Sequence, residues 1–235
     1  EWLLARFNSI VKDWPDTLAT KTKNWAFDSH LLSAEWANGQ HIWRTKPEAT
    51  EWLQIEMRAG SVFEGKEKNQ HPRAETLTTL WLHHVVACAS GTPTTSMQIG
   101  LNGVVQFDAL TEDEGTQCLH DLMTLYAEAW QQPLPLSRKS ACKYISALSF
   151  PNSTKAESPD QLHTTAISEA RKVFEDSHQR PGEFSESTSL QRVFSSFADI
   201  ETDLPMWAQR FYGAMVQRAR LVAMDTTVVV EESAL

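Results

Sequence analysis

Lysine and arginine are absent from a long internal stretch of this 235-residue sequence. No basic residue occurs between Arg73 and Arg138, whereas seven acidic residues lie in that interval. Residues 1–73 carry 10 basic and 10 acidic side chains, and residues 74–235 carry 11 basic and 20 acidic ones. Phosphate binding depends largely on cations, so the later two thirds of the chain form a poor candidate for enveloping DNA unaided.

Cysteines, long apolar runs and phosphate-binding loops are also scarce or absent. Three unpaired cysteines suit a reducing cytoplasm better than a disulfide framework, so we expect a cytoplasmic protein. No run approaches the about 20 apolar residues of a membrane helix, which predicts no membrane partner. The sequence has no Gly-x-x-x-x-Gly-Lys loop, which excludes an ATP motor of the usual kind. It begins at Glu1 without an apolar leader, and we expect a fragment of a longer protein.

The N-terminal part of the sequence predicts a helix followed by a β-rich section. Apolar residues at helical spacing run up to Pro15 and predict an amphipathic helix. Asn38-Gly39, inside Leu31–Thr45, predicts a hairpin, and the alternating segment Glu51–Arg58 predicts a strand. The polar loop Gly60–Pro72 is the best internal boundary. It divides an N-terminal helix and β-rich section (1–72), packed on the core, from the core with its C-terminal helices (73–235).

The central section predicts a helix, a hairpin and a second helix. The first helix spans about 73–89, and two short strands, Met97–Gly100 and Val104–Asp108, join through Asn102-Gly103. Thr111 and Glu114 form a capping box that predicts the start of the second helix. An unbroken apolar stripe then makes this the strongest helix prediction in the chain; it comprises Leu119, Leu122, Met123, Tyr126, Ala127 and Trp130.

The remainder is predicted to be mostly helical. Ser158-Pro159-Asp160-Gln161 combines an N-cap, a proline and a box-like Gln at a helix start. A short helix is expected near Leu190, and Asp203-Leu204-Pro205 begins a last long helix that we expect to include Leu221 and Val222. Thr226–Val230 reads as a strand. The mixture of helices and strands predicts an α/β protein.

One motif carries a resemblance to a known family. The run Gln132-Pro-Leu-Pro-Leu-Ser-Arg-Lys-Ser-Ala141, preceded by the helix of Thr111–Trp130 and by Ser90–Pro93, resembles the C-terminal domain of RecC. RecC is the gamma subunit of the RecBCD helicase–nuclease, exodeoxyribonuclease V. The resemblance is clearest over Leu77–Leu148. It implies a degenerate PD-(D/E)XK nuclease-like core, with a small mixed sheet flanked by helices and without catalytic residues.

The resemblance also implies a place in DNA repair by recombination. A RecC-like subunit scaffolds the complex, contacts RecB-like and RecD-like subunits, and assists strand separation at double-stranded DNA ends, with single-stranded DNA inside the complex. This domain is then expected to be non-catalytic by itself and to need no cofactor.

The residues allow an independent check on catalysis. Nucleases of this kind place an Asp on one strand and Asp/Glu-x-Lys on the next, so that carboxylates hold Mg²⁺ and the lysine steadies the attacking water. Here the second strand offers only Asp108, and no lysine follows before Lys139. Asp108 is therefore expected to be a cap or turn residue, with no metal site. Two alternatives stay open: an active Mg²⁺-dependent nuclease with migrated residues such as Lys139, and a partner-binding module without a DNA role.

Local basic clusters are the candidates for DNA contact. One surrounds the polar loop, which we expect to be the DNA-facing element, and the other follows the acidic helix; a plain solvated surface is the competing interpretation. The candidates are Arg58, Lys66, Lys68, Arg73, Arg138 and Lys139, with Lys143 nearby.

Zinc ligands are a weaker possibility. His84 and Cys88 lie four residues apart on one helix face, and Cys118 with His120 would complete a set of four. No Cys-x-x-Cys pair is present, and His or Cys on an apolar face usually packs in the core.

Overall fold

A five-stranded mixed sheet organises the chain. The computed structural model describes residues 41–45, 52–65, 69–151 and 158–222. The strands lie in the order β1-β2-β5-β6-β7, and only β2 and β5 run parallel to each other. Their bounds are β1 His41–Thr45, β2 Trp52–Met57, β5 Thr94–Gly100, β6 Gly103–Phe107 and β7 Arg220–Val222. The predicted α/β class, with a small mixed sheet flanked by helices, is confirmed.

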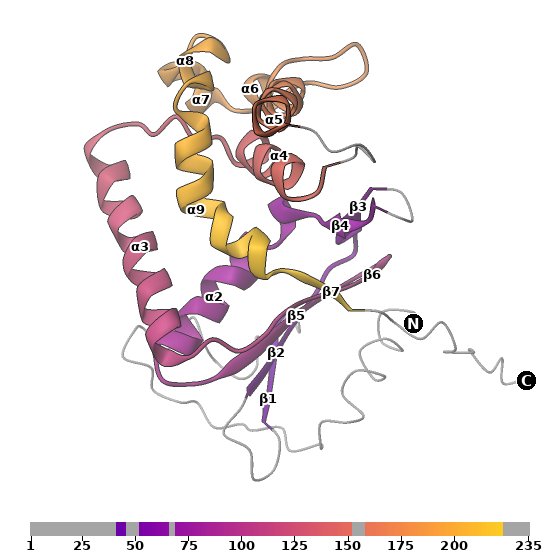
Figure 1. Ribbon diagram of the computed structural model, residues 1–235, viewed down its shortest axis with the longest axis vertical. Helices are drawn as coiled ribbons and strands as arrows, with labels where there is room; N and C mark the ends of the chain where they lie inside the picture. The colour runs from indigo at the N-terminus through magenta and orange to yellow at the C-terminus, as the bar shows by residue number, and fades with distance from the viewer. Residues whose placement is uncertain (1–40, 46–51, 66–68, 152–157, 223–235) are drawn as a thin grey trace, which may run out of the picture.

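The long helices lie together on one side of this sheet (Figure 1). In that view α3 stands at the left edge, whereas α4 and α5 lie on the right above the small β3-β4 pair. The remaining elements are β3 Phe63–Glu64, β4 His71–Pro72, the 3-10 helix η3 Ala74–Thr76, α2 Thr78–Ala89, α3 Glu112–Gln131, α4 Arg138–Ser149, α5 Pro159–Phe174, α6 Glu183–Glu186, α7 Thr188–Val193, α8 Ala198–Glu201 and α9 Leu204–Arg218.

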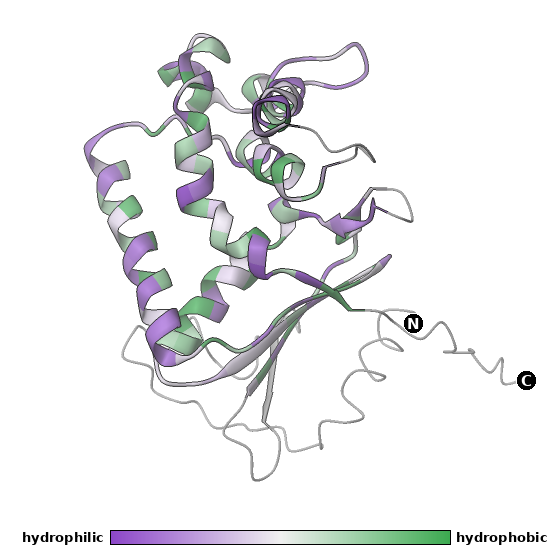
Figure 2. Ribbon diagram, viewed as in Figure 1, coloured by the Kyte–Doolittle hydropathy of each residue, from purple (hydrophilic) through white to green (hydrophobic). Residues whose placement is uncertain are grey.

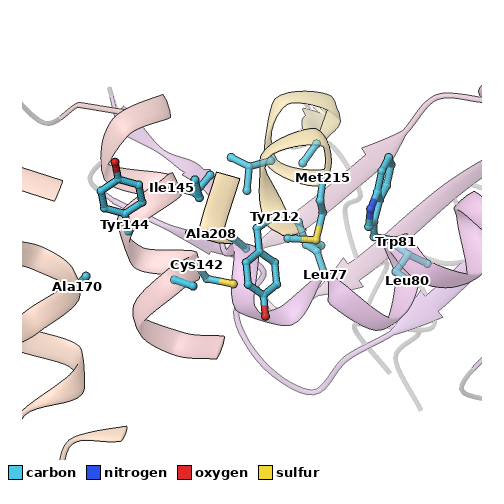
Figure 3. Close-up of a cluster of buried hydrophobic side chains, with 14 of the residues drawn as sticks. Leu77, Leu80, Trp81, Cys142, Tyr144, Ile145, Ala170, Ala208, Tyr212 and Met215 are labelled. Carbon is cyan, nitrogen blue, oxygen red and sulfur yellow. The ribbon is translucent and has the colours of Figure 1, made fainter. Parts of the chain in front are cut away.

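The crossover from β2 to β5 places α2 against the sheet, because parallel neighbours need a long connection. The side of α2 predicted to face inward is buried, including Leu80, Trp81 and Val85. Helix α9 packs between α2 and α4, where Tyr212 and Met215 enter the main core beside Cys142 (Figure 3).

The two faces of the sheet differ in polarity. Successive strand residues point to opposite sides, so Leu53 and Ile55 lie on the face away from α2 and form a second apolar cluster with Ile99 and Val104. The face toward α2 carries Gln54 and its neighbours Ser96 and Gln98, all fully buried. A buried polar layer thus lies between α2 and the sheet.

Several local predictions are confirmed. Both capping boxes form, at Thr111 and at Ser158. The turn at Asn102-Gly103 joins β5 to β6, and Gly103 has a φ of +155°. An added Cβ there would meet Phe63 Cε2 at 2.2 Å, so the turn requires glycine.

One boundary prediction is wrong. Helix α9 ends at Arg218, and Leu221 and Val222 belong to strand β7 rather than to the helix. They pair with Val105 and Val104 of β6, so strand pairing overrides the helical spacing. The predicted N-terminal helix, the hairpin turn at Asn38-Gly39 and the strand Thr226–Val230 lie outside the described residues. Within the described ranges, no helix is both long and apolar enough to cross a membrane.

Candidate functional site

A pocket of about 190 Å³ opens where η3, α4 and α5 meet the loop after α5. Four cationic side chains line it: Arg73, Lys139, Lys143 and Arg180. Arg73 and Lys139 are two of the predicted DNA-contact residues, and the fold brings them together across 66 positions of sequence. The base-free stretch lies between them in the chain and contains α2, β5, β6 and α3, so the pocket is a tertiary feature.

Carboxylates offset part of this positive charge. Arg73 Nη2 lies 2.6 Å from Glu75 Oε1, and Lys139 forms an ion pair with Glu186. Both pairs are partly exposed, so each contributes little to stability and leaves its cation available for exchange with another anion.

Glu64 of β3 is the most strongly perturbed acid at the pocket. Its Oε1 lies 3.2 Å from His71 Nε2 and 3.3 Å from Lys143 Nζ, and His71 stacks on Phe150 at 5.0 Å. The hydrogen bond from His71, followed by the Lys143 charge, lowers the pKa of Glu64 to about 2, against the opposing effect of burial. Glu64 is therefore ionised throughout the physiological range and keeps Lys143 paired.

Arg180 is the functional candidate that the sequence interpretation missed. Its side chain is exposed, and no ion pair links it to any residue in the described ranges. A short turn holds its backbone, since Arg180 N donates to Ser177 Oγ at 3.2 Å. Nothing local distinguishes this arginine from a solvated one; only the packing of the loop after α5 brings it to the pocket.

The start of α4 is occupied by a carboxylate of the same chain. Glu183 Oε1 accepts from Lys139 N at 2.8 Å, and Glu183 Oε2 accepts from Ser140 N at 2.9 Å and from Ser140 Oγ at 2.8 Å. Ser137 precedes the helix but makes no capping hydrogen bond through its side chain. The free backbone N–H groups at a helix start can bind an external anion, but here the Glu183 carboxylate already accepts from them.

The other predicted DNA-contact residues are spread more widely. Arg58 follows β2 and Arg138 begins α4; both are exposed, and neither lines the pocket. Lys66 and Lys68 lie outside the described residues.

Asp108, the acid that the sequence analysis tested as a possible metal ligand, directly follows β6. It is exposed, accepts from Gln106 Nε2 at 2.7 Å and forms an ion pair with Arg220 of β7. The neighbours of this carboxylate are thus an amide and a guanidinium. A hard divalent cation would need further oxygen ligands in place of that guanidinium.

The polar layer under α2 holds one further acid, Glu56 of β2. Gln98 Nε2 donates to Glu56 Oε1 at 3.1 Å, and burial raises the pKa of Glu56 despite this bond and the nearby Arg58. Alternation along the strand places Glu56 on the same face as Gln54. The period-2 pattern of β2 could therefore have predicted that Glu56 faces α2, but the sequence interpretation did not use it. The side chains shown to act on this carboxylate are thus the Gln98 amide and the Arg58 guanidinium, whereas a metal site would need a second acid.

Two of the four possible zinc ligands, His84 and Cys88, have other partners. His84 Nδ1 lies 3.0 Å from Ser96 Oγ, and Cys88 Sγ donates weakly to Thr94 O at 3.8 Å. Among the residues that the structure describes, no three His, Cys, Asp or Glu side chains are grouped so as to hold a metal ion.

Comparison with known proteins places the sequence in a family. No curated protein matches the chain. The family model for the RecC C-terminal domain matches residues 2–149, which is more than half of the chain and ends with helix α4. The chain therefore belongs to the RecC C-terminal domain family.

Proposed function

We propose that this domain is a non-catalytic part of a RecC-like subunit in a RecBCD-type helicase–nuclease, which processes double-strand DNA ends for recombinational repair. Family membership supports the RecC-like subunit and its RecB-like and RecD-like partners. The finer statements belong to the proposal: a degenerate PD-(D/E)XK core, a scaffolding role in subunit assembly, and a contribution to strand separation.

The observation that carries the non-catalytic proposal is the environment of Asp108. Metal-dependent phosphodiester cleavage needs carboxylates that converge on Mg²⁺ and a group that steadies the nucleophile. Asp108 instead pairs with Arg220, and Glu56 lies in the buried layer beneath α2 with Gln98 as its hydrogen-bond partner. These two acids occupy different environments, and each is already engaged with a positive or amide group.

Substitution of these acids should leave DNA cleavage by the assembled complex unchanged. The full-length RecC-like subunit would carry Asp108→Ala or Glu56→Gln and be assembled with its RecB-like and RecD-like subunits. Nuclease rates on linear DNA with Mg²⁺ are expected to stay within about twofold of wild type, whereas loss of a catalytic group lowers rates by about 100-fold or more. A large loss with Asp108→Ala in a complex that still assembles would favour the active-nuclease alternative.

We further propose that the cationic pocket faces the DNA backbone. Arg73, Lys139, Lys143 and Arg180 supply the charge, and Arg180 supports the proposal because it is exposed and has no ion pair with a described residue. Arg58, Arg138, Lys66 and Lys68 remain candidates for DNA contact from the sequence alone. Phosphate contacts of this kind position the duplex without reading its sequence.

Opposite substitutions at the pocket should shift DNA binding in opposite directions. Arg73→Ala with Arg180→Ala removes two cations, so the slope of log affinity against log salt should flatten by about 2 for the assembled complex. Glu64→Gln frees Lys143 and should steepen the slope by about 1. Arg192→Ala is the matched control, because Arg192 is an exposed arginine on α7 that does not line the pocket. Fluorescence anisotropy across a salt series measures these slopes; equal slopes in all variants would contradict the DNA-facing role.

A further inference from the structure

An exposed apolar stripe runs along α3. Met123, Tyr126 and Trp130 are 53, 58 and 76% exposed, although their spacing is that of a helix face buried against another element. Tyr126 and Trp130 meet edge to face with ring centroids 6.0 Å apart, so each limits the movement of the other. Apolar and polar bands alternate along α3 in Figure 2. Tyr, Trp and Met are among the residue types enriched at protein interfaces.

The side of α3 away from the stripe is packed against the domain. Leu125 on that side is 2% exposed, and the first turn of α3 crosses the end of α2, where an added Cβ at Gly115 would meet Ala89 N at 2.6 Å. Arg210 of α9 makes two hydrogen bonds to Glu128, at 3.0 and 2.5 Å, and Arg218 donates to Glu114 at 3.2 Å. These contacts fix the helix on its inner side and leave the stripe turned outward.

The negative charge of α3 favours a positively charged partner. Helix α3 has no basic residue, and the two arginines that approach it from α9 are paired with Glu128 and Glu114. Glu112 and Asp113 are exposed at the start of α3 and form no ion pair with any described residue. This acidic setting disfavours a DNA strand stacked on the rings and equally disfavours a second copy of the same acidic face.

The spacing of the stripe residues favours a helical partner. Met123, Tyr126 and Trp130 follow one another at intervals of three and four residues. This is the repeat of a helix–helix seam, in which side chains of one helix enter the spaces of the other.

From these observations we propose that the stripe Met123, Tyr126 and Trp130 on α3 docks an amphipathic helix of a protein partner, with an apolar seam and flanking Lys or Arg. The partner surface rests on the proposed function, since the helix would belong to the RecB-like or RecD-like subunit. The cationic pocket lies with α4 and α5 on the other side of the domain (Figure 1), so protein and DNA contacts would use separate surfaces.

Truncation of the stripe should weaken assembly. The full-length RecC-like subunit would carry Met123→Ser, Tyr126→Ser and Trp130→Ser together. The matched control carries Leu101→Ser, Val193→Ser and Met206→Ser, three large apolar residues that are about half exposed elsewhere. Dilution of the assembled complex, followed by mass photometry, gives the dissociation constant. We expect it to rise by about 30-fold or more for the stripe variant and to stay within about threefold for the control.

A charge substitution tests the basic flanks separately. Glu112→Lys with Asp113→Lys should weaken assembly, and raising the salt concentration should weaken wild-type assembly more than that of this variant. A photo-crosslinking amino acid in place of Tyr126 should attach to a helix of the RecB-like or RecD-like subunit, and mass spectrometry of the product identifies that helix. Thermal unfolding of every subunit variant controls for loss of folding.

Each contrary result has a distinct meaning. Equal dissociation constants for wild type and the stripe variant would overturn the docking surface and leave the proposed function standing. Crosslinking from position 126 to DNA or to a second RecC-like chain would overturn it as well. Failure of the wild-type subunit to assemble with either partner would instead contradict the proposed function.

Discussion

Replacing Glu183 with alanine should lower the free energy of unfolding by about 3–5 kcal/mol, because a charged acceptor shared by three donors is lost and those donors stay buried. Glu183 is 9% exposed, and it binds Lys139 N, Ser140 N and Ser140 Oγ. Ser140 is completely buried, so water cannot replace the carboxylate at its amide and hydroxyl groups. The change also removes negative charge from the start of α4, where the helix dipole favours it.

Urea unfolding followed by circular dichroism measures this effect. Glu186→Ala is the matched control, since Glu186 lies in the same short helix and pairs with Lys139 at the surface; it should cost at most about 1 kcal/mol. Glu183→Gln keeps one acceptor oxygen and should fall between the two. A loss below about 1 kcal/mol for Glu183→Ala would mean that solvent reaches the start of α4.

Acidification below pH 6.5 should destabilise the domain through His84. This residue is completely buried, and burial first, then the charge of Arg218, lowers the pKa of His84 to about 3. Ser96 Oγ donates to Gln54 Oε1, so the His84 Nδ1–H donates to Ser96 and Nε2 is left without a partner. A proton on Nε2 would be a buried donor without an acceptor.

The sign of the pH dependence follows from the two states. An unfolded His84 binds a proton near pH 6.5, whereas the folded one does so only near pH 3, so the unfolded state gains protons first as pH falls. Stability is therefore complete above pH 6.5 and declines toward pH 3, by about 3 kcal/mol at pH 4.5 and about 5 kcal/mol at the lower limit.

Unfolding free energies measured between pH 7 and pH 5 separate the contribution of His84 from those of the two perturbed carboxyl groups. The lowered pKa of Glu64 acts later, because its contribution is lost only between about pH 4.5 and pH 2. The raised pKa of Glu56 acts in the opposite direction and favours the folded state as that carboxyl is protonated. His84→Gln should be less stable at pH 7 but nearly flat from pH 7 to pH 5; an equally steep decline in that variant would contradict the assignment to His84.

Local structure was accessible to prediction where short-range hydrogen bonds decide it. Thr111 with Glu114, and Ser158 with Gln161, each satisfy free amides within one turn, so the helix starts could be predicted from four residues. The hairpin at Gly103 follows from the same locality. Prediction failed at Leu221, because its strand conformation depends on pairing with Val105, more than a hundred residues earlier.

The candidate sites show the same division. Arg73 and Lys139 were identifiable as basic residues, but their shared pocket with Arg180 depends on how η3, α4 and the loop after α5 pack. The stripe on α3 was visible as a helix signal, whereas its exposure depends on which neighbours the fold supplies to each side.

By itself, the sequence determined the helix starts at Thr111 and Ser158, the strands β2, β5 and β6, the base-free stretch between Arg73 and Arg138, and a resemblance that the family match bears out. These properties rest on composition and on interactions within a few residues. Only the tertiary structure decided that Asp108 pairs with Arg220, that Glu183 caps α4 and that the α3 stripe faces outward. Each of these depends on groups far apart in the chain, whose meeting is set by packing and burial rather than by local propensity.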